Sequence, residues 1–462
     1  MPKQTHPDGD GIREQAIDLL FAALAKDERG ETCGAVASQG DSGSHYSNVW
    51  TRDNVSPMLF FLRYDPAIVG LFLDALIRRQ SRSRRTFGLI PIGFSPRYDV
   101  VDYGGEEAIG AVHSVDSTLW FIILLGLFVE TTADIDWLRA RRGAFEAALG
   151  LLTGPRFDPL PLMAAPESVT EIDRPAGLYG YPLQLQVLLC LALRWAARLL
   201  VRLDLDLELA TWCRLEAEAI QSWINRWYWL DHQVVHERER LPGEEHGQDN
   251  PNPFNIDYSR IRPAVDRLPP DTGYLGGTLR TRHLDTRLWP FPNCLAATAG
   301  ILSSPRAEAL LSGISDHWEQ LIGPMPVAIC WPSLSGPDFE ILMDGDVLAR
   351  PGNYHNGAHW PHILWALVSA CLANGRGELA TDALAVAVHG LPPTWGEHYD
   401  HDGSLGMNAR TRQTWSIAGY LVADEAVRFG IAEFWQARLS PPGGWLAESS
   451  STASQVVREE GA

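Results

Sequence analysis

The chain has 462 residues with 38 basic and 57 acidic side chains, a formal net charge of −19 at pH 7. This charge disfavours nucleic-acid partners and anionic membrane surfaces, because both attract basic rather than acidic protein surfaces. The first residues lack the apolar core of a signal peptide, and the longest apolar run, 119–129, is too short to span a bilayer. We therefore expect a soluble cytoplasmic protein, whose acidity suits a small neutral polar substrate.

Helical periodicity runs through most of the chain, beginning with the i, i+3, i+4, i+7 pattern of 17–24. The run that follows Asp116 and the segment 183–200 are apolar almost all round, which is typical of helices buried on both sides. The segment 208–226 instead has a clear polar face. Two classes of helix, fully buried and half buried, indicate two concentric layers. Further helical patterns cover parts of 66–79, 296–312, 360–373, 379–389 and 415–429.

Long loops rich in Pro, Gly and Asn separate the helices at 240–255, 332–358 and 391–408. Loops of this length are unusual in compact domains unless they are functional, and these hold many aromatic and polar side chains. No strong domain boundary is visible. We expect one domain over 1–439 and a disordered tail over 440–462.

A shorter segment, 202–210, alternates apolar and polar residues as a strand does. It runs directly into a helical pattern, so we expect a loop and a helix start there. The six cysteines form no C-x-x-C pair, which favours free buried thiols. His355 and His359 have the i, i+4 spacing of helical metal ligands, but Gly357 and Pro361 argue against a helix. We expect no metal and no cofactor.

Four clusters of polar and aromatic residues are candidates for chemistry, at 48–57, 101–117, 352–361 and 394–415. Carbohydrate sites need aromatic faces for the sugar ring and planar side chains that donate and accept hydrogen bonds. These clusters supply both. Hydrolysis of a glycosidic bond also needs two carboxyl groups in different protonation states.

The first cluster contains Trp50, Arg52 and Asp53. The charged pair could hold sugar hydroxyls while the indole offers an apolar face. The alternative is a surface salt bridge beside a core tryptophan.

Asp116 stands directly before a strongly apolar run, and two interpretations of it are open. A carboxylate at a helix start satisfies unpaired N–H groups and complements the helix dipole. The same position, surrounded by apolar walls, could raise the pKa of a catalytic acid so that it holds a proton near neutral pH.

Six segments occur in the order of a known family: DYGGEEAIGAVHSVDSTLWFIILL, GLYGYPLQLQVLLCLALR, GYLGGTLRTRHLDTR, PMPVAICWPSL, NYHNGAHWPHILW and RTRQTWSIAGYLVADE. Together they resemble the alkaline/neutral invertases of plants and cyanobacteria, from about residue 12 to residue 430. The VWTRD segment is also similar to glucoamylase-like hydrolases. The resemblance implies an all-α (α/α)6 barrel, with six inner helices ringed by six outer ones and a pocket at one end.

The resemblance also implies an inverting hydrolase that splits sucrose into glucose and fructose without a cofactor. The general acid would be Asp116, at the start of an inner helix, with Ser114 or another group capping that helix. The general base would be Glu397. The family tends to assemble through helical faces, so a homo-oligomer is expected.

The family pattern further implies which residues surround the sugar. Asp173, Tyr179 and Asp285 are expected either to contact the substrate or to support the pocket. Residues expected to bind substrate are Trp50, Arg52, Asp53, Gln184, His355, Asn356, Trp360, Arg410, Gln413 and Trp415.

The chain departs from the family pattern at several positions. Gln184 replaces a usual Glu, Asn54 a usual Phe, Arg412 a usual Tyr and Ala111 a usual basic residue. A lost pocket group changes which hydroxyls a site accepts, so hydrolysis of a different small α-glucoside is one alternative. Another is a non-hydrolytic sugar epimerase or sugar-binding toroid, in which His355 and His359 would be candidates. A structural or interaction protein is a third.

Overall fold

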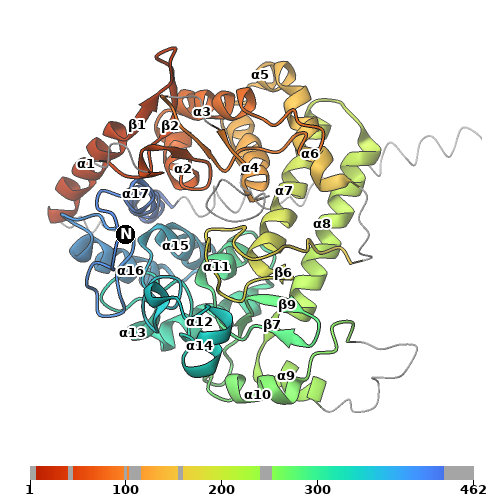
Figure 1. The fold of residues 1–462 in the computed structure, drawn as a ribbon, viewed down its shortest axis with the longest axis vertical. Coiled ribbons are helices and arrows are strands. Elements are labelled where there is room, and N and C mark those ends of the chain that lie inside the picture. Colours follow the sequence, from red (N-terminus) through yellow and green to blue (C-terminus); the bar gives the residue numbers. More distant parts are fainter. Residues whose placement is uncertain are drawn as a thin grey trace, which may run out of the picture.

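Two concentric rings of helices form the body of the computed structural model (Figure 1). The structure describes residues 7–39, 45–97, 101–103, 116–154, 160–239 and 252–430. Each inner helix contacts the next one along the chain, and the last contacts the first, so the inner ring closes. The inner helices are α2 (Val55–Tyr64), α4 (Asp116–Thr132), α7 (Leu183–Arg202), α11 (Pro290–Thr298), α15 (Leu364–Ala373) and α17 (Thr414–Phe429).

The outer helices alternate with the inner ones along the chain and pack against them. This arrangement confirms the predicted all-α (α/α)6 barrel. The outer helices are α1 (Pro7–Ala22), α3 (Pro66–Arg78), α6 (Arg142–Thr153), α8 (Leu207–Trp227), α12 (Ser304–Asp316) and α16 (Gly377–Gly390). Smaller helices are α5 (Ile135–Ala140), α9 (His232–Glu239), α10 (Tyr258–Val265), α13 (Trp318–Leu321), α14 (Gly336–Leu342) and the 3-10 turns at 45–47, 347–349 and 361–363.

The apolar patterns of the helices explain their places in the two rings. In α4 every residue from Asp116 to Val129 is buried, as expected for a helix covered on both sides. In α8 the buried residues recur every three or four positions, and the polar face lies outward. Side-chain caps mark some helix starts: Asp206 accepts a hydrogen bond from the backbone N–H of Leu209 where α8 begins. The prediction of a loop and a helix start at 202–210 is confirmed.

Two predicted helices differ in the structure. The segment 296–312 is not one helix, because α11 ends at Thr298 and α12 begins at Ser304. Gly300 has a φ of 64°, which interrupts the helix, and a proline stands in the first turn of α12. Leu24 does not extend α1; it begins a strand that pairs with the strand at 32–35.

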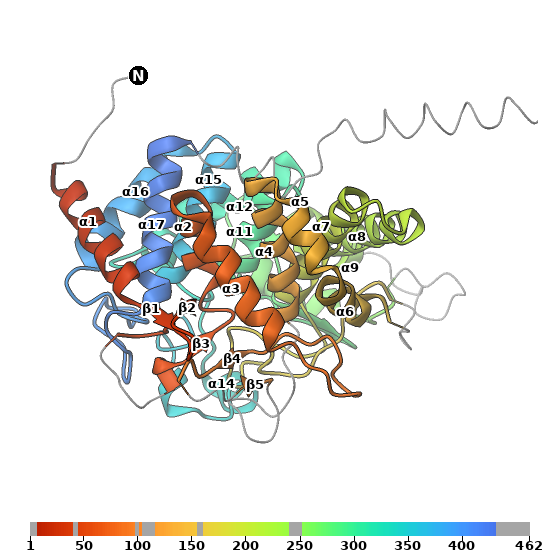
Figure 2. The same cartoon turned by 90° about the horizontal axis from the view of Figure 1, so that it is seen from above.

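Short strands and long loops gather at one end of the ring (Figure 2). They pair as β1–β2, β3–β4–β5, β6–β9–β10 and β7–β8, with antiparallel register throughout. Their bounds are β1 Leu24–Lys26, β2 Thr32–Ala35, β3 Val49–Trp50, β4 Gly93–Phe94, β5 Val101–Asp102, β6 Tyr181–Pro182, β7 Trp229–Leu230, β8 Tyr274–Leu275, β9 Thr278–Arg280 and β10 His283–Leu284.

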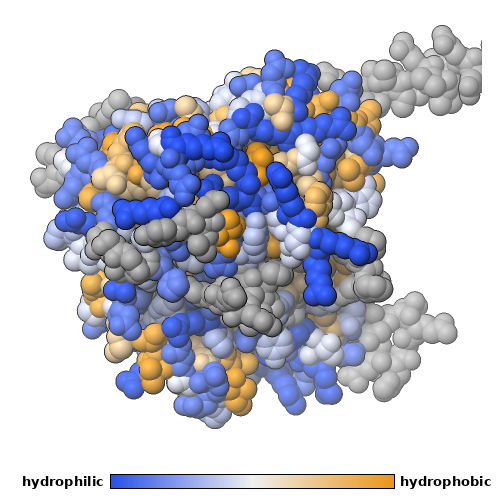
Figure 3. Space-filling model, turned by 45° about the horizontal axis from the view of Figure 1, so that its top comes forward, coloured by the Kyte–Doolittle hydropathy of each residue, from blue (hydrophilic) through white to orange (hydrophobic). Residues whose placement is uncertain are grey.

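One cluster of buried apolar side chains runs through the described helices. The predicted tail, 440–462, lies outside the described residues, so the domain boundary stays a prediction. All six cysteines are buried and free. Among the described helices, α7 is long and apolar enough to cross a membrane, but 78% of that segment is buried inside the fold. The face drawn in Figure 3 is mostly hydrophilic with scattered hydrophobic side chains.

The contact between α4 and α7 gives a stability prediction. A Cβ at Gly126 would lie 2.4 Å from Cε3 of buried Trp195. We expect Gly126→Ala to lower the free energy of unfolding by about 1–3 kcal/mol through overpacking, measured by urea denaturation. Gly150→Ala on α6 is the control, because nothing lies within 4 Å of its Cβ, and it should stabilise the helix by about 0.5–1 kcal/mol. Equal stability of the Gly126 variant and the parent would contradict this packing.

Candidate active site

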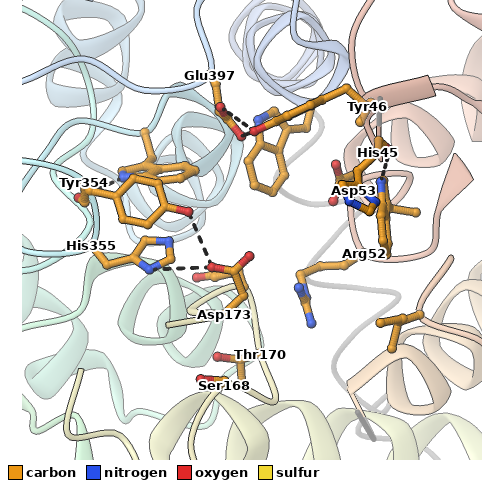
Figure 4. A pocket seen from close by; sticks show the side chains of 16 residues that line it. His45, Tyr46, Arg52, Asp53, Ser168, Thr170, Asp173, Tyr354, His355 and Glu397 are labelled. Carbon is orange, nitrogen blue, oxygen red and sulfur yellow. Dashed lines mark hydrogen bonds and ion pairs between the residues drawn. The ribbon is translucent and has the colours of Figure 1, made fainter. Parts of the chain in front are cut away.

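The loops at the strand-bearing end of the ring enclose a cavity of about 170 Å³. Its walls come from the turn after β3, the segment before β6, the turn before α15, the loop before α17 and the first turn of α17. Eight residues predicted from the sequence line it: Trp50, Arg52, Asp53, Asp173, His355, Trp360, Glu397 and Trp415. Figure 4 shows side chains converging on this cavity from several of these segments.

Asp116 lies behind the wall of the cavity and is held by a residue that lines it. It is the first residue of α4 and is fully buried. Arg52 donates from Nε to its Oδ2 at 2.5 Å. The prediction that Asp116 begins an inner helix is therefore confirmed, but its carboxyl group contacts the lining residue Arg52 and does not itself line the cavity. Ser114, the expected cap, lies outside the described residues.

Glu397 lines the opposite side of the cavity and is held by two donors. The hydroxyl of Tyr46 lies 3.0 and 3.1 Å from its two carboxyl oxygens, and the backbone N–H of Arg410 donates to Oε2 at 3.3 Å. Burial raises the pKa of Glu397 to about 7, although these two donors act in the lowering direction. Burial also raises the pKa of Tyr46 well above its usual value, so its hydroxyl stays a donor.

Three further carboxyl groups line the same cavity. Desolvation raises the pKa of Asp53 to about 7 and that of Glu171 to about 8, and it also raises the pKa of Asp173. The nearby Arg52 acts against each of these shifts. Among the described residues that line the cavity, Arg52 is the one arginine or lysine. The negative charges of several carboxyl groups are therefore balanced by a single guanidinium.

An aromatic wall faces these carboxyl groups. Tyr354 stacks on His355 with ring centroids 4.0 Å apart, and Trp360 stacks on His398 at 4.9 Å. The hydroxyl of Tyr354 lies 3.4 Å from Oδ1 of Asp173, as Figure 4 shows. Burial lowers the pKa of His355 and of His398 to about 3, so both imidazoles are neutral. The wall offers flat apolar surface without adding positive charge.

Six predicted substrate-binding residues do not line the cavity: Tyr179, Gln184, Asp285, Asn356, Arg410 and Gln413. The carboxylate of Asp285 accepts hydrogen bonds from the Arg287 guanidinium and the Trp289 indole, which matches the alternative of pocket support. The side chain of Asn356 bonds the backbone N–H and C=O of Leu334. Both residues hold loops together.

Three of the other four residues have the following positions, and Gln184 is described below. Tyr179 is 41% exposed. Arg410 is exposed, and its guanidinium carbon lies 5.1 Å from the ring centre of Tyr46. Gln413 is buried at the start of α17 and pairs with the backbone of Ser38. None of these three residues lines the cavity. For Arg410 and Gln413 this differs from the expected substrate contact, whereas for Tyr179 the sequence had left substrate contact and pocket support open.

Most departures from the family pattern lie away from the cavity. The side chain of Asn54 is buried and bonds the backbone N–H and C=O of Ala35. Arg412 is exposed, and Ala111 lies outside the described residues. Gln184 differs, because its amide donates to Oε2 of the cavity-lining Glu171 at 3.1 Å.

Sequence reasoning missed several lining residues, and those with titratable or hydroxyl groups near the carboxyl cluster include Tyr46, Glu171 and Tyr354. Tyr46 stands two positions before the 48–57 cluster, and Tyr354 stands within the 352–361 cluster, so proximity to these motifs was the available signal. Glu171 lies outside the four polar clusters and the six family segments, although it stands two positions before Asp173. His355 and His359 lie in a loop, not on a helix, so they lack the geometry of helical metal ligands.

The family model for alkaline and neutral invertases matches residues 18–428. The chain belongs to this family. It is 32% identical to alkaline/neutral invertase CINV1 of Arabidopsis thaliana, over 85% of this chain and 75% of that protein. It is also 32% identical to cytosolic invertase 1 of Oryza sativa subsp. japonica, over 86% and 74% of the two chains. It is therefore a glycoside hydrolase of the invertase type.

Solved structures support the fold. A mannosylglycerate hydrolase from Thermus thermophilus, solved with glucose, superposes with a TM-score of 0.56 and 14% identity over 91% of this chain and 100% of that chain. A bacterial glucoamylase solved with acarbose gives a TM-score of 0.58 and 14% identity over 94% and 58%. At these identities the likeness concerns the helical barrel alone.

The environment of Glu397 gives a titration prediction. We expect Tyr46→Phe to raise the pKa of Glu397 above about 7, because the hydroxyl that stabilises the carboxylate is removed. Carbon-13 NMR of labelled glutamates measures this pKa, with Glu397→Gln assigning the signal. Tyr420→Phe is the control, since that buried hydroxyl bonds no described residue. The same titration curve in the parent and the Tyr46 variant would contradict the assigned role.

Proposed function

We propose that this invertase-family protein hydrolyses sucrose to glucose and fructose with inversion, with Asp116 as general acid and Glu397 as general base. The arrangement around the cavity carries the proposal: Glu397 and the guanidinium of Arg52, which holds Asp116, occupy opposite sides in Figure 4. An inverting glycosidase needs two opposed carboxyl groups, roughly 6.5–9.5 Å apart, with room for a water between them.

In the proposed reaction, Asp116 donates its proton to the glycosidic oxygen, and fructose leaves as a neutral alcohol. A water attacks the anomeric carbon of glucose from the opposite face, and Glu397 accepts a proton from this water. The new C–O bond replaces the glycosidic bond. Asp116 ends ionised and Glu397 ends protonated, and proton exchange with solvent restores both groups.

The raised pKa of Glu397 agrees with its role as the base. With a pKa of about 7, Glu397 is ionised above neutral pH, so activity should rise as the pH increases through about 7. Arg52 and Asp116 form a close ion pair, so the proposal requires this pair to separate when a sugar enters and Asp116 acts as the acid.

The location and partners follow as part of the proposal. We place the protein in the cytoplasm, as a homo-oligomer that binds neither nucleic acid nor membranes and acts on a small neutral sugar. Relatives include cytosolic invertases, which supports this location, and also chloroplastic ones.

Removal of either carboxyl group tests the catalytic assignment. We expect Glu397→Gln and Asp116→Asn each to lower kcat on sucrose by about 10²–10⁴-fold, because each loses one proton-transfer group. Released glucose measures the rate, and Glu308→Gln on the surface of α12 is the matched control. Activity that survives Glu397→Gln would favour the isomerising alternative. Turnover of trehalose or another small glucoside, with none of sucrose, would favour the other-glucoside alternative.

The stereochemistry of the product tests the mechanism separately. Sucrose is an α-glucoside, so inversion must release β-glucose first. Proton NMR of the anomeric signals, recorded before mutarotation, should show the β-anomer in excess. An early excess of α-glucose would make Glu397 a nucleophile and contradict its role as base.

A further inference from the structure

Glu171 is a buried carboxyl group that lines the cavity and takes no part in the proposed mechanism. It lies in the segment before β6 and is 7% exposed. The amide of Gln184, from the first turn of α7, donates to its Oε2 at 3.1 Å. Asp116 and Arg52 lie close enough to act on its charge. Glu171 therefore stands at the side of the cavity where the acid is held.

Its partner Gln184 occupies a position where the family pattern has a carboxylate. Of the described departures from that pattern, Gln184 is the one whose side chain hydrogen-bonds the side chain of a lining residue; Asn54 bonds only the backbone of one, Trp50. Position 184 of α7 therefore has no carboxyl group in this chain, but Glu171, which hydrogen-bonds Gln184, supplies one from the segment before β6. The carboxyl group on this side of the cavity thus comes from residue 171 and not from residue 184.

The chemistry of Glu171 suits a sugar hydroxyl. Burial raises its pKa to about 8, and Asp116 acts in the same direction, so the carboxyl group is mostly neutral near pH 7. A neutral carboxyl group both donates and accepts a hydrogen bond, as a hydroxyl does, whereas a carboxylate only accepts.

A second polar group stands near this position. Trp415, Glu171 and Arg52 line both the cavity and a smaller adjoining chamber, which His362 also lines. The indole Nε1–H of Trp415 is buried and has no hydrogen-bond partner among the described residues. Buried donors are usually paired, so this N–H is free to donate to a ligand that enters the cavity.

We infer that Glu171, oriented by Gln184, binds a hydroxyl group of the sugar at the side of the cavity where Arg52 holds Asp116. This contact determines which glucosides are accepted. The inference rests on the proposed function in one respect, that the ligand is a hexose unit. Glu171 is thus a specificity-determining residue and not an additional proton donor to the glycosidic bond.

The test compares two variants of equal size. Glu171→Gln keeps a neutral group that donates and accepts, and Glu171→Met removes both abilities. Isothermal titration measures the affinity for glucose and for its 2-, 3-, 4- and 6-deoxy analogues, and sucrose turnover is measured in parallel. Gln186→Met on α7 is the matched control, because Gln186 is buried and hydrogen-bonded to Met163 but does not line the cavity.

We expect Glu171→Met to weaken glucose binding by about tenfold or more, and Glu171→Gln to change it by less than about threefold. One deoxyglucose should bind the parent and Glu171→Met equally, because the hydroxyl that Glu171 binds is already missing. Gln186→Met should alter the melting temperature and leave the ratios among the sugars unchanged. An equal loss for every analogue, no loss in Glu171→Met, or a parent that binds none of these sugars would overturn the inference.

A pH comparison decides the matter if Glu171→Met does not fold. Arg52 and Asp116 act on the charge of Glu171, His362 lines the same chamber, and other carboxyl groups line the same cavity: Asp53, Asp173 and Glu397. These groups are unchanged in Glu171→Gln, so their titration affects both curves alike. Glucose affinity of the parent should fall above pH 8 as Glu171 ionises, whereas Glu171→Gln should show no such fall. Parallel curves above pH 8 would overturn the inference. If the variants, deoxy sugars and pH curves behave as expected but sucrose is not hydrolysed, the proposed function is contradicted and the inference about Glu171 still holds.

Discussion

The crowding of buried carboxyl groups around Arg52 is the constraint on which the rest of the pocket depends. An ionised carboxylate taken out of water without a partner loses several kcal/mol, so one guanidinium cannot keep every neighbouring carboxyl group charged. Some of these groups therefore hold a proton more readily: burial raises the pKa of Asp53 to about 7 and that of Glu171 to about 8. A pocket of this kind holds protons on some carboxyl groups and charge on others at the same pH. That division is what acid–base cleavage of a glycosidic bond requires.

The turn that carries Arg52 is accordingly held by neighbouring backbone. Thr51 bonds the C=O of Pro91 through its hydroxyl at 2.7 Å and the C=O of Ile92 through its N–H at 2.8 Å. On the other side, the Asn54 side chain bonds Ala35 of β2. The departure at 54 thus supports the turn without touching the sugar pocket. Catalytic groups held by such supporting contacts keep their geometry better than groups on an unsupported loop.

The two layers of helices could be predicted from local pattern, because the apolar residues of each helix show whether one face or all faces are buried; the six-plus-six barrel was predicted from the family resemblance. The break between α11 and α12 could not be predicted, since the apolar spacing continues across Gly300 and only its φ of 64° ends the helix. In the site, the motifs identified the charged residues Arg52, Asp53 and Glu397, but they did not show which of the other polar motif residues line the cavity. Asn356 and Asp285 belong to motif segments, yet their hydrogen bonds go to the protein. Glu171 comes from a segment with no periodic or motif signal, and only the folded chain brings it to the cavity.

The two proposed catalytic carboxyl groups depend on closure of the ring. Asp116 is fixed by α4, but Glu397 is held by Tyr46, 351 positions earlier in the chain. The same two segments are joined nearby, because the backbone N–H of Thr414 donates to the C=O of Ala37 at 2.8 Å. Contact between α17 and α2 therefore brings the base and its supporting hydroxyl together. A chain that formed most of the barrel without this last contact would have the acid side of the pocket but no positioned base, so the site forms only with the complete ring.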